Sequence, residues 1–200
     1  MDNLEVDSVI YQPAVNKSWH PLYGERSTVR EAYNEATMYL SKKDGSNYRL
    51  NIEVRAYDEG IAFRYFFPEH PQAIFHKVVG DLTEYTFSPG AMAWAEQWAQ
   101  APFEHLAIND IKQPVERALT VELSNGLWVA LTDADVDDWC LTKLVASPTK
   151  QNTLTSVMYS PVDIVTYYAT PWKVIMAADK PGELLEHNDI IQNLNPPCEI

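Results

Sequence analysis

The strongest constraint on the fold is an alternation of apolar and polar residues in two neighbouring segments, Arg49–Tyr57 and Ile61–Phe67. Alternation with a period of two is typical of a half-buried β-strand, because successive side chains point to opposite faces of a sheet. A polar turn ending in Gly60 joins the two segments, and Pro68 ends the second one. The pattern predicts a β-hairpin in which Gly60 adopts a positive φ.

A second hairpin is predicted from Ala118–Leu123 and Leu127–Thr132, which flank Ser124-Asn125-Gly126. Asn-Gly between alternating segments is the strongest short-range hairpin signal, because both residues accept the backbone angles of a tight turn. Six further segments have the composition and the bounding residues of strands: Glu5–Gln12, Thr37–Ser41, Tyr85–Ser88, Thr153–Tyr159, Asp163–Ala169 and Trp172–Ala177.

Three segments are candidates for helices: Thr28–Glu35, the alanine-rich Ala91–Gln100, which could instead be an extended lid, and Gly182–Asn193, which follows a proline. Many short strands and few helices predict an all-β fold, most simply a sandwich. Hydrophobic residues make up 46% of the chain, which is enough for a real core. Because no composition shift marks an internal linker, we expect a single domain over residues 1–200.

The charge balance excludes one class of partner. The chain has 15 Lys and Arg residues against 28 Asp and Glu residues, a net charge of −13, and its basic residues are scattered. A nucleic-acid-binding protein needs a clustered basic footprint, so we expect no nucleic-acid partner. No apolar stretch is long enough to span a membrane, and the first residues lack the pattern of a signal peptide.

Common catalytic and redox signatures are missing from the sequence. It contains no nucleophile elbow, phosphate-binding loop, zinc-protease motif or paired CxxC, and we therefore predict no catalytic residue. Cys140 and Cys198 are too few and too far apart for a disulfide framework or a zinc site, and we expect both to be inert. The histidines are dispersed and favour surface or structural roles: His20, His70, His76, His105 and His187.

An acidic stretch follows the second hairpin and has two interpretations. Asp133, Asp135 and Asp137 alternate, so in an extended chain their carboxylates would project to the same side and could bind a hard cation such as Ca²⁺. The spacing is not that of an EF-hand, and a solvated acidic loop explains the same residues. In the first hairpin, Arg55 and Arg64 favour a structural role in which carboxylates hold them in register.

Tryptophans offer a separate hypothesis. An exposed indole ring is a platform on which a sugar ring can stack, but aromatic side chains are also the largest pieces of a β core. The sequence does not decide between these roles for five of the tryptophans, which are Trp94, Trp98, Trp128, Trp139 and Trp172.

Taken together, several motifs resemble the N-terminal domain of glycoside hydrolase family 97, a family of α-glucosidases and α-galactosidases. They occur in family order over nearly the whole chain, and the longest is EVRAYDEGIAFRY at Glu53–Tyr65. The other matching segments are Ser18–Pro21, Tyr23–Arg26, Tyr33–Glu35, Ala130–Ala134, Pro171–Ile175, Pro181–Leu185 and Asn193–Cys198.

The resemblance implies a two-sheet β-super-sandwich, similar to that of galactose mutarotases, with a few short helices. It also implies a catalytic (β/α)8 barrel after residue 200, which would hold the two catalytic carboxylates and bind an α-linked oligosaccharide. Family members are exported, so a periplasmic or secreted location is expected although this sequence shows no leader. In the family a Glu-Ala pair supplies one calcium ligand, and Asp133-Ala134 stands in its place.

Asp133 is therefore the predicted metal ligand, with a side chain shorter by one methylene than the family's glutamate. Because the other ligands would come from the barrel, we expect the chain alone to bind calcium weakly or not at all. We consequently expect a non-catalytic N-terminal domain that forms part of an active-site wall and supplies a calcium ligand. The alternatives are a free-standing carbohydrate-binding module and a mutarotase-like enzyme, which would need a histidine and a carboxylate in one cleft.

Overall fold

The computed structural model describes residues 3–46, 48–70 and 74–196, and nearly all regular structure in them is antiparallel β. The strands up to the middle of the chain are β1 (Leu4–Tyr11), β2 (Val15–Trp19), β3 (Val29–Lys42), β4 (Arg49–Tyr57), β5 (Gly60–Phe67), β6 (Phe75–Val78), β7 (Glu84–Thr86), β8 (Met92–Ala95) and β9 (Glu104–Ala107). The later elements are a 3₁₀ turn (Ile108–Asp110), β10 (Leu119–Glu122), β11 (Trp128–Ala134), β12 (Thr142–Ala146), β13 (Thr153–Met158), β14 (Val162–Val165), β15 (Tyr168–Ala169), β16 (Trp172–Ala178), α1 (Glu183–Glu186) and α2 (Asp189–Leu194).

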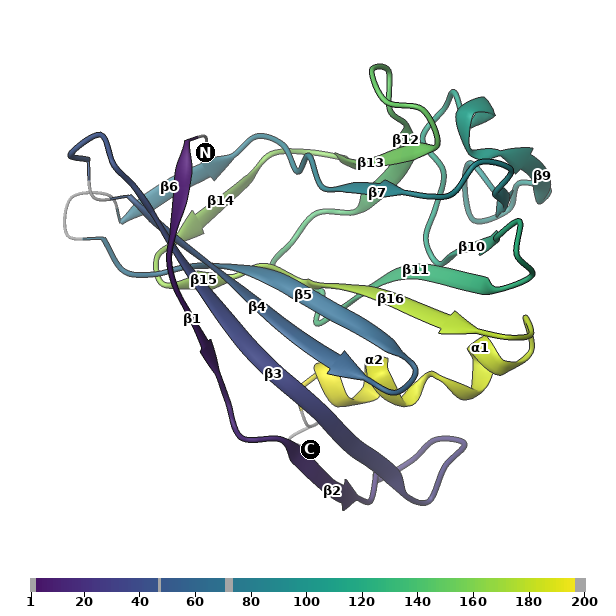
Figure 1. Cartoon of the computed structure of the whole chain (residues 1–200), viewed down its shortest axis with the longest axis horizontal. Helices are drawn as coiled ribbons and strands as arrows, with labels where there is room; N and C mark the ends of the chain where they lie inside the picture. The colour runs from purple at the N-terminus through teal and green to yellow at the C-terminus, as the bar shows by residue number, and fades with distance from the viewer. Residues whose placement is uncertain (1–2, 47, 71–73, 197–200) are drawn as a thin grey trace.

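Two layers of strands form the body of the domain. The large sheet has the order β1-β3-β4-β5-β16-β11-β10-β8-β9, with β2 paired to β3 and β15 paired to β5. A second layer consists of the sheet β12-β13-β7 and the pair β14-β6. Figure 1 shows this layer above β5, β16 and β11, with α1 and α2 on the opposite side of the large sheet.

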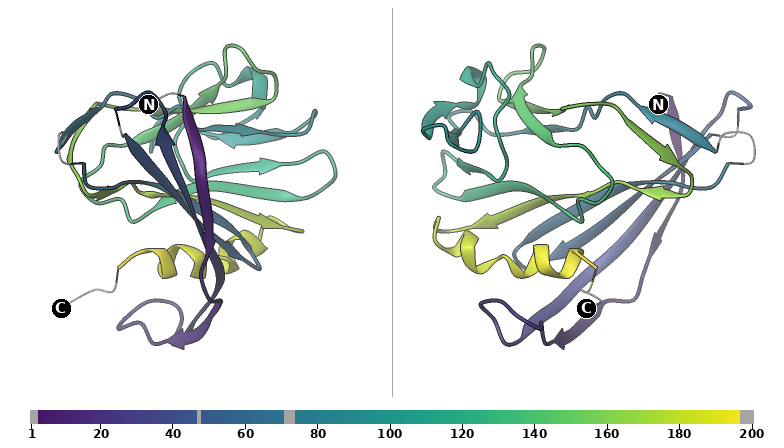
Figure 2. Two further views of the ribbon diagram at one scale, coloured as in Figure 1. Left: turned by 60° about the vertical axis from the view of Figure 1, so that its left-hand side comes forward. Right: turned by 180° about the vertical axis from the view of Figure 1, so that it is seen from behind.

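Alternation along β11 shows how each face of the large sheet is buried. Val129 and Leu131 belong to the core between the two strand layers, together with Leu144 and Leu154 of the second layer. Ala130 and Ala134 belong to a second core, which packs under the helices through their apolar residues Leu184, Ile190 and Leu194. The two turned views in Figure 2 show the same three-layer order of strands, large sheet and helices. The all-β super-sandwich with a few short helices is thus confirmed.

Both predicted hairpins are present, but the role assigned to Gly60 was wrong. Gly60 is absent from the residues with a positive φ, whereas Gly126 in the Asn-Gly turn has a φ of 88°. A Cβ atom at Gly60 would lie 2.2 Å from the backbone oxygen of Ile175 on the neighbouring strand β16. Glycine is therefore required here for a close approach of two backbones, and not for the turn.

The helix predictions were correct only at the end of the chain. The segment Gly182–Asn193 is helical as predicted, but it forms two short helices separated by two residues, and the second one ends one residue later, at Leu194. Thr28–Glu35 was wrong, because it lies mostly in the long strand β3, which pairs with β1, β2 and β4. A helix in Ala91–Gln100 was also wrong, since β8 occupies its first half and buries Ala93 and Ala95 at alternate positions. Pairing with neighbouring strands overrides local helix propensity in both segments.

Candidate functional site

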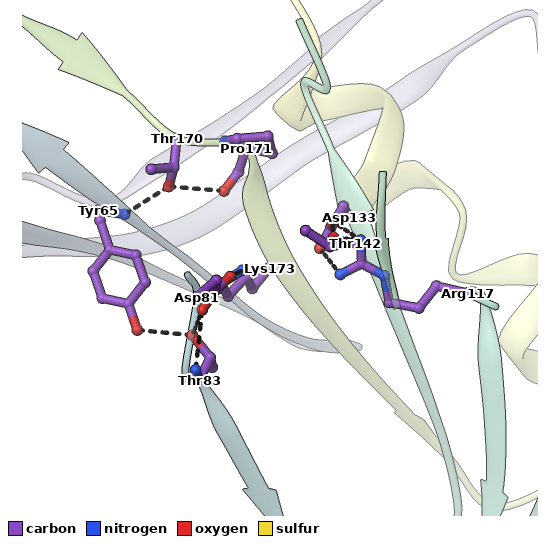
Figure 3. A network of polar contacts seen from close by, with 9 residues as sticks. All are labelled: Tyr65, Asp81, Thr83, Arg117, Asp133, Thr142, Thr170, Pro171 and Lys173. Carbon is purple, nitrogen blue, oxygen red and sulfur yellow. Dashed lines mark hydrogen bonds and ion pairs between the residues drawn. The ribbon is translucent and has the colours of Figure 1, made fainter. Parts of the chain in front are cut away.

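Asp133, the predicted metal ligand, lies near the end of β11 in the space between the two strand layers (Figure 3). Its carboxylate accepts hydrogen bonds from both terminal nitrogens of Arg117, with Nη1 2.5 Å from Oδ1. The hydroxyl of Thr142, the first residue of β12, donates to Oδ2 over 3.0 Å. The side chains of Arg117 and Asp133 are only 9% and 6% exposed, so this bidentate pair is buried.

The donor set around Asp133 does not fit a cation in the described part of the chain. Three hydrogen bonds already engage its two oxygens, and the described residues contain no group of three His, Cys, Asp or Glu side chains that could hold a metal ion. Asp135, which has a φ of 56°, turns away from the strand and its Oδ2 lies 3.5 Å from Nη1 of Arg64. The expected projection of Asp133 and Asp135 to one side was therefore wrong, while calcium binding by Asp133 stays a prediction.

A second buried ion pair lies beside the first. Lys173 of β16 is directly opposite Asp133 in the pairing of β11 with β16, and its ammonium group contacts the carboxylate of Asp81. The backbone nitrogen and the hydroxyl of Thr83 donate to Asp81 over 3.0 and 2.6 Å, and the Tyr65 hydroxyl lies 2.9 Å from the Thr83 hydroxyl. Figure 3 shows the two ion pairs side by side between the strand layers.

The environment of this polar layer shifts two pKa values in opposite directions. Burial alone would raise the pKa of Asp81, but the charge of Lys173 and the hydrogen bonds from Lys173 and Thr83 outweigh it and lower the pKa. Burial raises the pKa of the Tyr85 hydroxyl, and the negative charge of Asp133 raises it further. The layer therefore keeps Asp81 ionised and Tyr85 neutral at neutral pH.

A cleft of about 920 Å³ lies on the helix side of the large sheet. Its floor is the indole of Trp172, flanked by two arginines whose guanidinium carbons lie 4.9 Å (Arg55) and 4.4 Å (Arg64) from a Trp172 ring centroid. Trp172 itself is only 2% exposed. We name this feature the arginine–tryptophan cleft, because cation–π contacts between these three residues form its base.

Carboxylates fix both arginines of the cleft, as predicted from the sequence. Nε of Arg55 donates to Glu35 over 2.7 Å, and Nε of Arg64 donates to Glu53 over 2.6 Å. Each bond joins neighbouring strands of the large sheet, so the arginines hold the strands in register. Since each contact uses only Nε, the terminal nitrogens point toward further partners, such as Asp135 for Arg64.

The walls of the cleft come from segments far apart in the sequence. One wall is the connection between β2 and β3, which includes Leu22 and Tyr23, and the other is the end of α2 with Asn195 and Pro196. Nε1 of Trp19 donates to the side chain of Asn193 over 2.8 Å and so joins the two walls.

Both walls are anchored beyond this contact. Arg26 reaches from the connection to both helices, where Nη2 donates to the backbone oxygen of Glu186 over 2.7 Å and Nε lies 2.9 Å from Asp189. The backbone nitrogen of Asp135 donates to the Asn195 side chain over 2.9 Å. Side-chain contacts between distant segments thus hold the walls of the cleft in place.

Of the remaining predicted residues, one histidine belongs to the cleft and another lies at the far edge of the large sheet. His20 lines the cleft and its Nδ1 lies 2.9 Å from the backbone oxygen of Ser27, whereas His105 stacks on Trp94 in the hairpin of β8 and β9. Cys140 is a free thiol, and Cys198 lies outside the described residues. In the described part of the chain, no helix is long and apolar enough to cross a membrane.

Sequence reasoning missed the cleft and Arg117. The cleft could not be predicted because its walls join residues 160 or more positions apart, as in the contacts of Trp19 and Arg26. Arg117 carries no local signal, since it precedes β10 and meets Asp133 only through the pairing of β10 with β11.

The sandwich of two strand layers, with helices and a cleft on the outer face of the large sheet, defines the chain as a large β-super-sandwich domain. The family model described as Glycosyl-hydrolase 97 N-terminal matches residues 1–197. The chain therefore belongs to the N-terminal domain family of the family 97 glycoside hydrolases, which confirms the resemblance found in the sequence.

Solved structures share the fold at low sequence identity. A glycoside hydrolase family 97 enzyme from Pseudoalteromonas sp. strain K8, in complexes with acarbose and with panose, matches with a TM-score of 0.91 and 23% identity over 99% of the chain. A beta-arabinopyranosidase matches with a TM-score of 0.78 and 18% identity over 88% of the chain. The chain spans 31% of the Pseudoalteromonas enzyme and 32% of the beta-arabinopyranosidase, so it corresponds to about a third of each.

Proposed function

We propose that the chain is the non-catalytic N-terminal domain of an α-glycosidase, an α-glucosidase or α-galactosidase, and that it packs on a (β/α)8 catalytic domain of the same parent protein. The observation that carries this proposal is the family match over residues 1–197, which identifies an N-terminal domain. Support for the sugar class comes from the Pseudoalteromonas enzyme of the same family, whose structures hold acarbose and panose.

The carboxylates of the cleft support a non-catalytic role. Glycosidases use two carboxyl groups on either side of the glycosidic bond, and one of them must hold a proton that it can give to the leaving group. In the cleft, Glu31 lies 3.1 Å from the ammonium group of Lys17, and Asp135 lies 3.5 Å from Arg64. Each carboxylate is therefore engaged by a cation of a neighbouring element and helps to hold the walls of the cleft.

The arginine–tryptophan cleft is the surface that we assign to the catalytic domain. Pro196, two residues after the end of α2, lines its edge. On the opposite wall, Leu22 and Tyr23 are 76% and 78% exposed, although both are large and apolar. We call Leu22 and Tyr23 the rim of the cleft. Large apolar side chains exposed beside a cleft are typical of a surface that another domain covers. The domain would then form part of the active-site wall.

Two parts of the proposal rest on the family resemblance alone. The first is that calcium binds in the parent protein with Asp133 as one ligand, which requires that Arg117 release at least one carboxylate oxygen. The second is export of the parent protein to the periplasm or out of the cell. Calcium binding is testable by titrating the parent protein and its Asp133→Asn variant, which should lose affinity if Asp133 is a ligand.

A binding experiment tests the assigned interface. The parent's catalytic domain, produced separately, is titrated with the 200-residue chain, with the chain carrying Leu22→Ser and Tyr23→Ser, and with a Tyr159→Ser control. Tyr159 is 80% exposed but follows β13 of the second layer, so it matches Tyr23 in residue type and exposure. We expect the rim variant to bind at least about tenfold more weakly, because interface aromatics contribute most of the binding energy. Equal affinity of the rim variant and the unchanged chain would refute the interface.

A further inference from the structure

The outer face of the large sheet carries a stacked pair of rings that the helices leave uncovered. Trp94 of β8 and His105 of β9 are directly opposite each other, with ring centroids 4.4 Å apart and an angle of 16° between the ring planes. Trp94 is 41% exposed, although its neighbours Ala93 and Ala95 point inward and are buried. An indole held flat against a second ring on a solvent-exposed sheet face is a preformed stacking surface.

Polar groups surround the two rings. The Glu122 carboxylate of β10 lies 3.7 Å from Nε2 of His105, and its side chain is 42% exposed. Thr120 of β10 is the direct neighbour of Trp94 on the other side, so the row across β9, β8 and β10 reads His105, Trp94, Thr120. We name Trp94, His105, Thr120 and Glu122 the ring platform. It combines a flat apolar surface with a hydroxyl group, which can donate and accept hydrogen bonds, and a carboxylate, which accepts them.

The structure separates Trp94 from the other candidate tryptophans. Trp172 is buried in the cleft floor, Trp139 stacks on Tyr168 with centroids 5.9 Å apart, and Trp128 packs against the core under the helices. Trp98 is 57% exposed in the turn after β8, but the described rings contain no stacking partner for it. Trp94 is therefore the tryptophan that is both exposed and fixed in orientation.

The chemistry of the platform selects among ligands that contain a ring. A nucleic acid would bring phosphates to a chain with a net charge of −13 and to a platform with a carboxylate at its edge. A neutral pyranose has an apolar face of C–H groups for the indole and hydroxyl groups that donate to a carboxylate. We propose that the ring platform binds one pyranose unit of an α-linked oligosaccharide, at a place on the sheet separate from the arginine–tryptophan cleft. The choice of α-linked sugars rests on the function proposed above.

The platform lies far along the sheet from the cleft. The order β1-β3-β4-β5-β16-β11-β10-β8-β9 places β8 and β9 at one edge, whereas β2 and β3, which form a wall of the cleft, lie toward the other edge. In Figure 1, β9 is at the right and β2 is at the bottom. The platform is thus a different part of the sheet from the cleft, and a polysaccharide bound there would raise the local substrate concentration.

Titration of the 200-residue chain with maltotriose and with melibiose, followed by tryptophan fluorescence and calorimetry, tests the proposal. We expect saturable binding of at least one sugar with a dissociation constant on the order of 1 mM, as for a single small contact. Trp94→Leu, which keeps an apolar side chain but removes the flat ring, should weaken binding about tenfold. Glu122→Gln, an exposed change that leaves the fold intact, should also weaken it, and circular dichroism checks that each variant is folded.

Trp98→Ala is the matched control, because it removes an exposed tryptophan from the same hairpin and should leave the affinity unchanged. The proposal is overturned if the folded chain binds neither sugar, or if Trp94→Leu and Glu122→Gln bind as tightly as the unchanged chain. These results leave the proposed function intact as long as the parent protein hydrolyses α-glycosides. If the parent protein hydrolyses no α-glycoside but the chain still binds sugar at Trp94, the proposed glycosidase function is refuted and the proposed sugar site at the ring platform stands.

Discussion

Removal of the Asp133 carboxylate tests how much the buried ion pair between Arg117 and Asp133 contributes to stability. In an Asp133→Leu variant, the Arg117 guanidinium stays buried without its bidentate partner, and its Nε already lacks a hydrogen-bond partner in the described structure. Loss of one member of a buried ion pair typically costs about 3–5 kcal/mol, because the remaining charge is desolvated and unpaired. For a domain of this size, roughly 2–4 °C of Tm correspond to 1 kcal/mol, so we expect a decrease of about 10 °C.

The assay is urea and thermal unfolding, followed by circular dichroism and tryptophan fluorescence. An Arg117→Met/Asp133→Leu double variant replaces both charges by apolar groups and should cost less than Asp133→Leu alone, since no unpaired charge remains. Glu31→Gln is the surface control, because its partner Lys17 is 65% exposed and such pairs contribute about 0–1 kcal/mol. The reasoning is refuted if Asp133→Leu has the same free energy of unfolding as the unchanged chain. It is also refuted if the loss of stability in the double variant equals the sum of the losses in Arg117→Met and Asp133→Leu.

Three further predictions concern acid, backbone packing and calcium. The pKa of Asp81 is lower in the folded state than its ordinary value of 3.8, so its stabilising contribution is complete above about pH 4 and is lost as the pH falls through the lowered value. As the pH is lowered from 6 to 2, the free energy of unfolding should therefore fall less steeply in Asp81→Asn than in the unchanged chain. Equal slopes in the two proteins would contradict this. Gly60→Ala should destabilise the chain by roughly 1–3 kcal/mol in urea unfolding, whereas Gly182→Ala, with open space around its Cβ position, should not. Calcium should leave the Tm of the chain unchanged, because Arg117 and Thr142 engage Asp133, and a calcium-dependent rise that Asp133→Asn abolishes would disprove this.

Local patterns were enough to predict the hairpins and the fold class. Residues 49–67 alternate along their length, and Asn125-Gly126 gives a turn signal that needs no tertiary context. The failures have a common physical cause, which is pairing with strands outside the segment itself. Thr28–Glu35 has the length of a short helix, but two strands pair with its residues and extend them into β3.

In the candidate site, too, contacts between neighbouring strands were predictable and contacts between distant segments were not. The structural role of Arg55 and Arg64 was predictable, because their glutamate partners belong to the same group of neighbouring strands. The polar layer was not predictable, since Lys173 meets Asp81 across 92 positions and nothing in either local sequence indicates burial. The interior therefore depends on register between β11 and β16, which no single segment encodes.

Hydrolysis by the parent protein is the most direct test of the central claim that this chain is the non-catalytic N-terminal domain of an α-glycosidase. The intact parent, the 200-residue chain and the parent without residues 1–196 are compared on nitrophenyl α-glucoside and α-galactoside. The account predicts that the intact parent hydrolyses one of the two, that the chain alone hydrolyses neither, and that the shortened parent loses activity and recovers part of it when the chain is added. Hydrolysis by the chain alone, or an intact parent inactive on both substrates, would contradict the claim.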